Sequence, residues 1–234
     1  NNAQSSTQAA VSDGARIIGA AAVKIDAKKL TNSGSIYATQ NLSVLAENLA
    51  NSGILYTGDT QTLTVTESLQ TRGTIAAGKD LTIRADNLSG TSTSVLAAGM
   101  AADGKLSSTG RLTVDTSGAL QSAGQVLATN DMSLEGSSLN LAGSQTGTAV
   151  GDVSLTASNG DINTRQVHLS TPGKLFITAN AQAVQKLDNT EGQISAQQLN
   201  IRVGQLVNDH GAIEQTGTSV QTASIQTALG LNNT

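Results

Sequence analysis

Cysteine is absent from this chain of 234 residues, and aromatic side chains are scarce, with one Phe, two Tyr and no Trp. The lack of cysteine excludes disulfide bonds and thiolate metal sites. Proline occurs once, which argues against a proline-rich disordered linker. Charged residues make up 13% of the chain, about half the usual share. Ser, Thr, Asn, Gln, Gly and Ala fill the space, with aliphatic residues spread evenly among them.

Charge and hydropathy exclude two kinds of partner. The net charge is −4 and no basic stripe is present, so we expect no nucleic acid partner. The longest uncharged apolar stretch, VLAAGMAA at 95–102, is too short for a membrane span. The first residues, NNAQSSTQAAVSDG, lack the basic and apolar regions of a signal peptide. We therefore expect either a cytosolic protein or a piece of something longer.

The chain contains an internal repeat of about twenty residues. Leu-Thr-Asn-Ser-Gly at 30–34 returns as Leu-Ala-Asn-Ser-Gly at 49–53. An alternating apolar pair also recurs every 18 to 24 residues, with one longer step of 31. The pairs begin at Val23, Leu42, Leu63, Leu81, Leu112, Met132, Val153, Leu175 and Leu199. Alternation of this kind predicts short strands, and a period of about twenty residues predicts a solenoid.

A second alternating pair follows Leu-x-Asn-x-Gly in each unit, as in GSIYA at 34–38. Such short strands bury a face only when equivalent strands stack about 4.8 Å apart. Because the chain always circulates in one sense, these strands run parallel. The sequence thus predicts an all-β fold, a parallel β-helix of about ten coils, which the general crossover rule makes right-handed. We expect it to span 17–227, after an irregular lead-in at 1–16 and before a tail at 228–234.

Asparagine and glycine recur at fixed places in the unit. The asparagines share one phase with the inward leucines, so they are expected to form an amide ladder or to bond the turn backbone. The glycines that follow fit a turn with positive φ. The predicted ladder and turn residues are Asn32, Gly34, Asn51, Gly53, Gly73, Asn189, Gly192, Asn208 and Gly211. An outward row is expected to be mostly Ser and Thr: Lys24, Ser43, Thr64, Thr82, Thr113, Ser133, Ser154, Phe176 and Asn200.

The step of 31 residues from Leu81 to Leu112 is the clearest departure from the period. It holds about ten residues more than a coil needs, which predicts an irregular insertion near 84–111. Loops that interrupt solenoids often carry binding surfaces, although one imperfect coil with a small bulge fits equally. The candidate contact residues are Val95, Leu96, Met100, Asp103, Lys105 and Phe176.

These residues resemble the filamentous-haemagglutinin repeat, most closely in LTNSGSIYA, LQTRGTIAAGKDLTI and LDNTEGQISAQQLNI. The resemblance covers roughly 17–227. It implies a right-handed β-helix in the shaft of a two-partner-secretion exoprotein, either an adhesin or a contact-dependent growth inhibition protein. These 234 residues contain no Asn-Pro-Asn motif of the kind found in the amino-terminal secretion domain and no recognisable toxin domain, so we expect them to be a stretch of the shaft.

The same resemblance implies the partners and the location. They are the rest of the parent exoprotein, a dedicated outer-membrane transporter, and a receptor on a host cell or neighbouring bacterium. The expected location is the exterior of a Gram-negative cell. The function implied is a non-enzymatic structural and adhesive segment. A receptor-binding module built on 82–111 is the alternative, and a polysaccharide-active enzyme is a further one.

The search for chemistry gives no catalytic, cofactor or metal site. GTIAAGKD at 73–80 and GMAADGKL at 99–106 match G-x-x-x-x-G-K but lack the following hydroxyl of a phosphate-binding loop. His168 and His210 are expected on the surface and in a turn. Asp131 and Asp152 fall one coil apart, so they form either a functional acidic pair that shares a cation or raises one pKa, or part of a solvated ladder of weak ion pairs. Tyr37 and Tyr56 occupy corresponding places in adjacent coils, with Tyr56 expected to be out of register by one residue.

Overall fold

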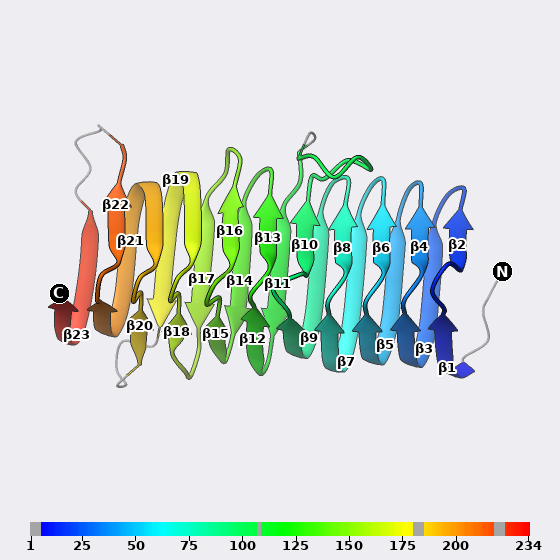
Figure 1. The fold of residues 1–234 in the computed structure, drawn as a ribbon, viewed down its shortest axis with the longest axis horizontal. Helices are drawn as coiled ribbons and strands as arrows, with labels where there is room; N and C mark the ends of the chain where they lie inside the picture. The colour runs from blue at the N-terminus through cyan, green and yellow to red at the C-terminus, as the bar shows by residue number, and fades with distance from the viewer. Residues whose placement is uncertain (1–5, 107–108, 180–184, 218–222) are drawn as a thin grey trace.

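The computed structural model describes residues 6–106, 109–179, 185–217 and 223–234, and these residues form an all-β solenoid without a helix. In Figure 1 the chain ascends on the near side, crosses the top, and descends behind while it advances toward the C-terminus. This path is a right-handed coil. All strand pairings among the described strands are parallel, and about ten coils are stacked. The predicted parallel β-helix is confirmed.

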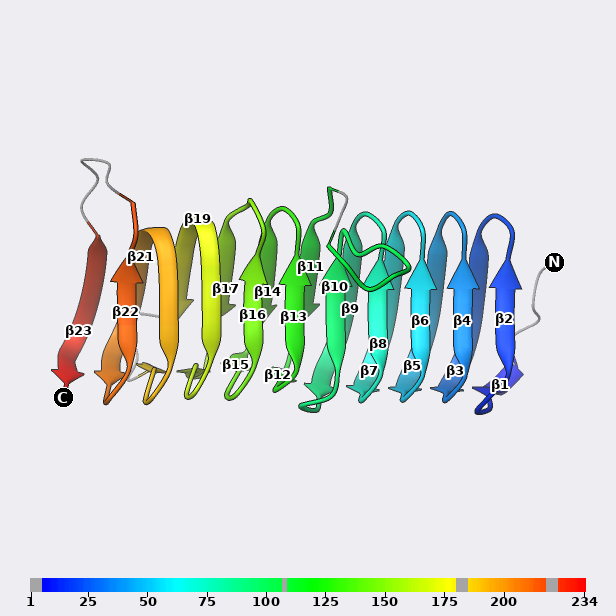
Figure 2. The ribbon, with the colours of Figure 1, turned by 45° about the horizontal axis from the view of Figure 1, so that its top comes forward.

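Each coil contributes to three faces, which we call faces 1, 2 and 3. Face 1 lies on the near side of Figures 1 and 2. It consists of β2 (Arg16–Gly19), β4 (Ser35–Ala38), β6 (Ile54–Thr57), β8 (Thr74–Ala77), β10 (Val95–Ala98), β13 (Gln125–Ala128), β16 (Gln145–Thr148), the starts of β19 (His168–Ala179) and β21 (Gln193–Asn208), and β22 (Ala212–Gln215).

Face 2 follows face 1 along the chain. It consists of the first parts of β3 (Val23–Asn32), β5 (Leu42–Asn51), β7 (Gln61–Thr71) and β9 (Leu81–Gly90), then β11 (Leu112–Thr116), β14 (Met132–Gly136), β17 (Val153–Ala157), the end of β19, the middle of β21 and the start of β23 (Ser224–Asn233).

Face 3 closes the coil. It consists of β1 (Ser6–Val11), the last parts of β3, β5, β7 and β9, then β12 (Ala119–Ser122), β15 (Ser138–Asn140), β18 (Ile162–Asn163), β20 (Lys186–Asp188), and the ends of β21 and β23. The repeated Leu-x-Asn therefore lies in a third strand, whereas the sequence pattern predicted two strands in each unit.

The stacked strands extend beyond the boundaries expected from the sequence. Strand β1 pairs with β3, with Ala9 opposite Leu30, so residues 6–11 belong to the stack rather than to an irregular lead-in. At the other end β23 runs to Asn233 and pairs with β21, which takes in most of the expected tail.

The core is a set of aliphatic columns inside the coils. On face 1, one column places the same kind of side chain at the same height in five successive coils: Ile36, Leu55, Ile75, Leu96 and Val126, none more than 1% exposed. Full burial of each such side chain contributes about 1.5–3 kcal/mol. The interior is one side chain deep from each face, which leaves little room for Trp or Phe and explains the aromatic-poor composition.

The register differs from the sequence alignment at one coil. Gln61 lies between Leu42 and Leu81, so Leu63 is the partner of Val44 rather than of Leu42. The pattern aligned Leu63 with Leu42 because it required an apolar residue at both inward positions. In the true register Thr62, and not Thr64, joins the outward Ser/Thr row of face 2.

Gln61 is a weak point of this core. Its side chain is fully buried, and neither its Oε1 nor its Nε2 has a hydrogen-bond partner among the described residues. Each buried, unsatisfied polar atom costs about 1–3 kcal/mol. We expect Gln61→Leu to raise the free energy of unfolding by about 2 kcal/mol, measured as a higher urea midpoint. Gln70→Leu on the exposed side of face 3 is the control. A loss of stability in Gln61→Leu would mean that a buried water satisfies the amide.

The insertion is shorter than expected and begins later. Strands β9 and β10 pair with their neighbours in full register, so 82–98 form part of a regular coil. Residues 78–80 join β8 to β9, whereas 99–111 join β10 to β11. In Figure 2 this longer connection lies across face 1 over β8.

Candidate functional site

The asparagines predicted to form a ladder do so, in two groups. Asn32 Nδ2 donates to Asn51 Oδ1 at 2.8 Å. Nearer the C-terminus, Asn189 Nδ2 donates to Asn208 Oδ1 at 2.7 Å, and Asn208 Nδ2 donates to Asn233 Oδ1 at 2.7 Å. Each amide therefore points toward the next coil, and the ladder side chains also bond the turn backbone.

Hydrogen bonds from the asparagine side chains to backbone carbonyl oxygens close the turns at the corner between faces 3 and 1. Asn51 Nδ2 donates to the carbonyl oxygens of Gly53 and Thr74 at 3.3 and 3.2 Å. Asn189 Nδ2 does the same with Gly192 and Ala212 at 3.1 and 3.3 Å. An amide buried among carbonyl oxygens supplies the donors that this corner lacks. Both expected roles, the ladder and the turn bond, are present in the same side chains.

The reason for the recurrent glycine is different from the one expected. None of Gly34, Gly53, Gly73, Gly192 and Gly211 has positive φ. Instead a Cβ would collide with the preceding coil: at Gly53 it would lie 2.0 Å from Gly34 O. At Gly73 it would lie 2.0 Å from Gly53 O. The stack is so close at this corner that only hydrogen fits. In the C-terminal coils positive φ falls one residue earlier, on Glu191 and His210.

Asp131 and Asp152 do not form a free acidic pair. Asp131 Oδ1 accepts the backbone N–H of Asp152 at 3.1 Å, and Asp152 Oδ1 accepts that of Lys174 at 2.7 Å. Asp131 Oδ2 also accepts from Arg111 at 2.8 Å. Asp80 Oδ1 accepts the backbone N–H of Arg111 at 2.8 Å in the same way. Each carboxylate thus caps the start of the face 2 strand in the next coil, a role that the sequence pattern did not reveal.

Asp188 is the buried carboxylate of face 3. Burial alone would raise the pKa of Asp188, but hydrogen bonds from Thr190 and the charges of Lys186 and Arg165 lower it below its ordinary value. The ion pairs measure 3.4 Å to Lys186 and 3.5 Å to Arg165. The carboxylate is held ionised by partners that saturate its oxygens, which is a structural arrangement rather than an acid–base site.

The insertion packs onto a tyrosine pair on face 1. Tyr37 and Tyr56 lie opposite each other in register, and their rings stack with centroids 5.4 Å apart. Tyr56 is 9% exposed, and its hydroxyl donates to Met100 O at 3.2 Å. Met100 and Leu106 form an antiparallel bridge and pack with Tyr56 in a small second core outside the coils. The expected shift of register at Tyr56 is absent.

The candidate contact residues separate into buried and exposed groups. Leu96 points into the main core, and Met100 is 7% exposed where it packs with Tyr56, so neither offers a contact surface, contrary to expectation. Val95 is half-buried beside the second core. Asp103 and Lys105 are exposed at the tip of the insertion and form an ion pair at 3.8 Å. Of the candidate contact residues in the insertion, only Asp103 and Lys105 are exposed enough to contact a partner.

Phe176 and the histidines are on the surface, as their phase predicts. Phe176 lies in the Ser/Thr row of face 2, between Ser154 and Asn200, and is 38% exposed. His168 is exposed on face 1, and His210 is exposed in a turn beside Asp209, with 2.6 Å between His210 Nδ1 and Asp209 Oδ1.

Removal of the insertion tests this packing. Deletion of 100–109 leaves a connection of the same length as 78–80. We expect the coils to fold and Tyr56 to become exposed. Burial, Tyr37 and Asp103 raise the pKa of Tyr56, so phenol ionisation followed by ultraviolet absorbance should move to lower pH in the deletion. The Tyr56→Phe variant identifies the signal. An unchanged titration curve would contradict the packing described above.

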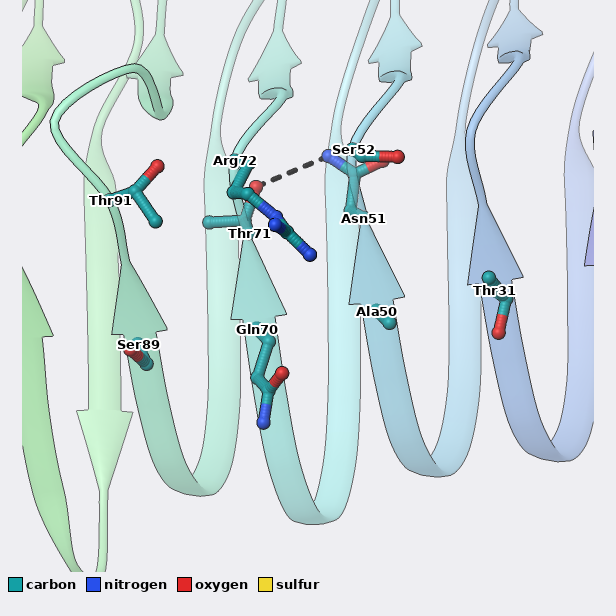
Figure 3. Close-up of a pocket in the computed structure, with 9 residues that line it drawn as sticks. All are labelled: Thr31, Ala50, Asn51, Ser52, Gln70, Thr71, Arg72, Ser89 and Thr91. Carbon is teal, nitrogen blue, oxygen red and sulfur yellow. Dashed lines mark hydrogen bonds between the residues drawn. The ribbon is translucent and has the colours of Figure 1, made fainter. Parts of the chain in front are cut away.

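A groove lies on face 3 toward the N-terminal end of the rod (Figure 3). It measures about 250 Å³ and runs across the ends of β3, β5, β7 and β9. Arg72 is its one charged side chain and extends toward the preceding coil. Asn51 and Thr71 at its back are joined by a hydrogen bond of 3.2 Å. The groove is the corner of the stack itself, because its polar groups already serve the turns.

The described residues form no metal-binding cluster and no phosphate-binding loop. No group of three or more His, Asp or Glu lies close enough to hold a metal ion there. The G-x-x-x-x-G-K stretch at 73–80 is β8 and its turn, and Lys79 pairs with Asp59 at 3.0 Å. Within the same described part, no helix is long and apolar enough to cross a membrane.

Comparison with known proteins adds to this geometry. The family profile of the haemagglutinin repeat matches residues 1–100, 96–182 and 148–234, which together cover the chain. The chain is also similar to Toxin CdiA of Yersinia pestis, with 38% identity over 146 residues. That similarity covers 62% of this chain and 4% of the relative, so the chain spans a small fraction of the relative's length. No solved structure matches.

Proposed function

Because this chain belongs to the haemagglutinin-repeat family, we propose that it is a rigid, non-enzymatic shaft segment of a large exoprotein. The observation that carries the proposal is the unbroken stack: all three faces continue from coil to coil through the described strands. Each coil adds about 4.8 Å to the length of the rod. A rod of this kind separates the parts of a protein that lie at its two ends.

The polar groups support a structural rather than a catalytic role. The ladder asparagines, the capping aspartates and Asp188 each bond the backbone or a neighbouring side chain. Catalytic carboxylates need free oxygens with pKa values suited to proton transfer. The oxygens of Asp131, Asp152 and Asp188 instead accept hydrogen bonds from backbone N–H groups or neighbouring side chains.

We further propose that the parent protein is secreted through an outer-membrane transporter and displayed on a Gram-negative cell surface. The similarity to a protein named as a toxin supports a toxin-bearing parent over an adhesin. In such a parent this segment would hold a recognition or effector module away from the cell.

Deletion of one whole coil tests the shaft role. Removal of 42–60 joins Asn41 to Gln61, and Gln61 takes the register of Leu42. We expect the parent exoprotein to keep its surface display and its cell-directed activity. Removal of 42–51 is the control, because it takes out two faces of a coil and breaks the stack. If the whole-coil deletion folds but abolishes activity, the segment acts through specific residues rather than through length.

A receptor contact at the insertion is the second candidate function. The insertion favours it, since it lies across the otherwise regular face 1 (Figure 2) and its residues Asp103 and Lys105 are exposed. Binding of the purified chain to bacterial and epithelial cells, compared with the 100–109 deletion, decides the matter. Saturable binding that the deletion removes would support a receptor contact, and equal binding would exclude it.

A further inference from the structure

Face 2 carries a second outward row beside the Ser/Thr row, which we call the charged row. It runs in register through nine successive coils, from β3 to β21. Its charged members stand at the first, fourth, fifth, sixth and ninth positions and are Asp26, Arg84, Asp115, Glu135 and Arg202. One leucine and three threonines fill the other positions, and β23 adds an uncharged glutamine after the ninth.

These five charged side chains are available to a partner. All five are exposed, and none of them makes an ion pair within the described part of the chain. Opposite charges of adjacent coils do pair elsewhere on the rod, as Lys79 and Asp59 do at 3.0 Å. The charged row thus differs from the other charged positions that adjoin it in the stack.

The order of charges along the row is complementary to its own reverse. Asp115 is at the centre, and its first neighbours on the two sides, Arg84 and Glu135, have opposite charges. The fourth neighbours, Asp26 and Arg202, again have opposite charges, and the positions between are uncharged on both sides. An antiparallel copy of the row laid over the first therefore sets an acid against a base at every charged position except Asp115.

We propose that face 2 binds a second copy of this chain, with the two rods side by side and antiparallel. The twofold axis lies in the contact plane, runs along the strands and passes through Asp115, so the order of coils is reversed while each row faces itself. Arg84 then faces Glu135 of the second copy and Asp26 faces Arg202, and each contact occurs twice. A shift by one coil sets Asp115 against Glu135 in one direction and leaves Asp26 and Arg202 without opposite charges in the other. The charge order therefore selects one register.

The neighbouring Ser/Thr row fits the same arrangement. Its mostly small side chains let the two faces approach each other closely. Leu45 and Phe176 are large apolar side chains that point outward from face 2, exposed by 42% and 38%. Phe176 stands in the eighth coil, and the reversal places it over Ser43 in the second coil, two residues before Leu45 on the same strand. Each end of the contact thus brings these two apolar side chains together.

The contact is at the small end of specific interfaces. Nine coils extend about 40 Å and two rows of side chains are about 12 Å wide, so each copy buries roughly 500 Å². We expect a dissociation constant on the order of 10 μM that rises with salt concentration. The dimer is a property of face 2 alone and does not depend on the shaft role.

Sedimentation of the purified chain up to about 200 μM measures the dimer, and small-angle X-ray scattering measures its length. We expect a dimer about as long as one rod. A chain that stays monomeric at that concentration would overturn the proposal. A dimer about twice as long would also overturn it, because the rods would then associate through their ends.

Asp115→Asn tests the position of the axis by a gain in affinity. It removes the one contact between like charges, and the exposed side chain can be changed without effect on the core. We expect the dimer to tighten by about threefold or more. An unchanged or weaker dimer would contradict an axis through Asp115.

Charge reversal tests the pairing itself. Arg84→Glu and Glu135→Arg should each weaken the dimer by about tenfold or more, because each sets like charges against one another twice. An equimolar mixture of the two variants should dimerise about as well as the original chain, since every contact then again joins an acid and a base. Arg72→Glu makes the same change at an exposed position of face 3 and should leave the dissociation constant within about twofold. A mixture that stays monomeric, or an equal loss in Arg72→Glu, would overturn the assignment.

Discussion

Asn189→Asp is expected to destabilise the protein by about 4 kcal/mol or more at pH 7, because it replaces a buried donor with a buried charge. Asn189 is fully buried. Its Nδ2 faces three oxygens, those of Gly192, Ala212 and the Asn208 side chain, at 3.1, 3.3 and 2.7 Å. A carboxylate oxygen in that place donates nothing and repels all three. Urea unfolding followed by circular dichroism measures the loss.

The pH dependence distinguishes charge from shape. Burial among acceptors raises the folded-state pKa of the new carboxyl above its unfolded value of about 3.9. The folded state therefore binds the proton more tightly, and stability falls as pH rises from the unfolded pKa to the folded pKa. We expect the deficit of Asn189→Asp to shrink as pH falls from the folded pKa and to be smallest below about pH 4, where both states are protonated and the acid donates one hydrogen bond in the folded state. A deficit that does not change with pH would contradict this account.

Asn200→Asp is the control for the same chemical change. Asn200 is exposed on face 2, in the outward Ser/Thr row. A carboxylate there stays in water, so we expect a change within about 0.5 kcal/mol. A comparable loss in both variants would show that net charge, rather than the ladder, controls stability.

Sequence periodicity predicted the solenoid well because the signal repeats. The inward phase of Leu49 and Asn51 is visible in one unit and is confirmed by its return in others. The amide ladder followed from that phase alone. The reason for the glycines did not follow, since the close approach of stacked backbones is a property of neighbouring coils. In a single repeat unit, the glycine after the asparagine indicates only a turn residue with positive φ.

Register and insertion were harder to predict for physical reasons. Gln61 breaks the apolar pattern, so any rule that seeks alternating aliphatics skips it and shifts the alignment by two residues. The insertion was placed too early because VLAA at 95–98 continues directly into it without a change of hydropathy. Its packing on Tyr56 links residues that are 44 apart, and periodicity carries no information about such contacts.

The capping role of Asp131 was also outside the reach of a sequence pattern. A carboxylate before a strand is compatible with solvent, a metal or catalysis, and only the position of the next coil's backbone N–H selects among them.

Gly53→Ala is expected to cost about 3–5 kcal/mol, because the new methyl group would occupy the place of the preceding coil. The Cβ would lie 2.0 Å from Gly34 O and 2.8 Å from the carbonyl carbon of Ser33. Both are backbone atoms and cannot rotate away. Separation of the coils would break the bonds from Gly53 N to Asn32 O and from Ile54 N to Gly34 O, now 3.1 and 2.9 Å.

Gly104→Ala separates this effect from backbone conformation. Gly104 has φ of +82° and open space around it, so alanine there costs only the left-handed penalty of about 1–2 kcal/mol. In a solenoid each coil contacts only its neighbours, and therefore hydrogen exchange in Gly53→Ala should accelerate most in β4, β6 and β8. Protection in β19 and β21 should persist. Uniform loss of protection along the rod, or a smaller cost than in Gly104→Ala, would mean that the coils do not depend on close contact at this corner.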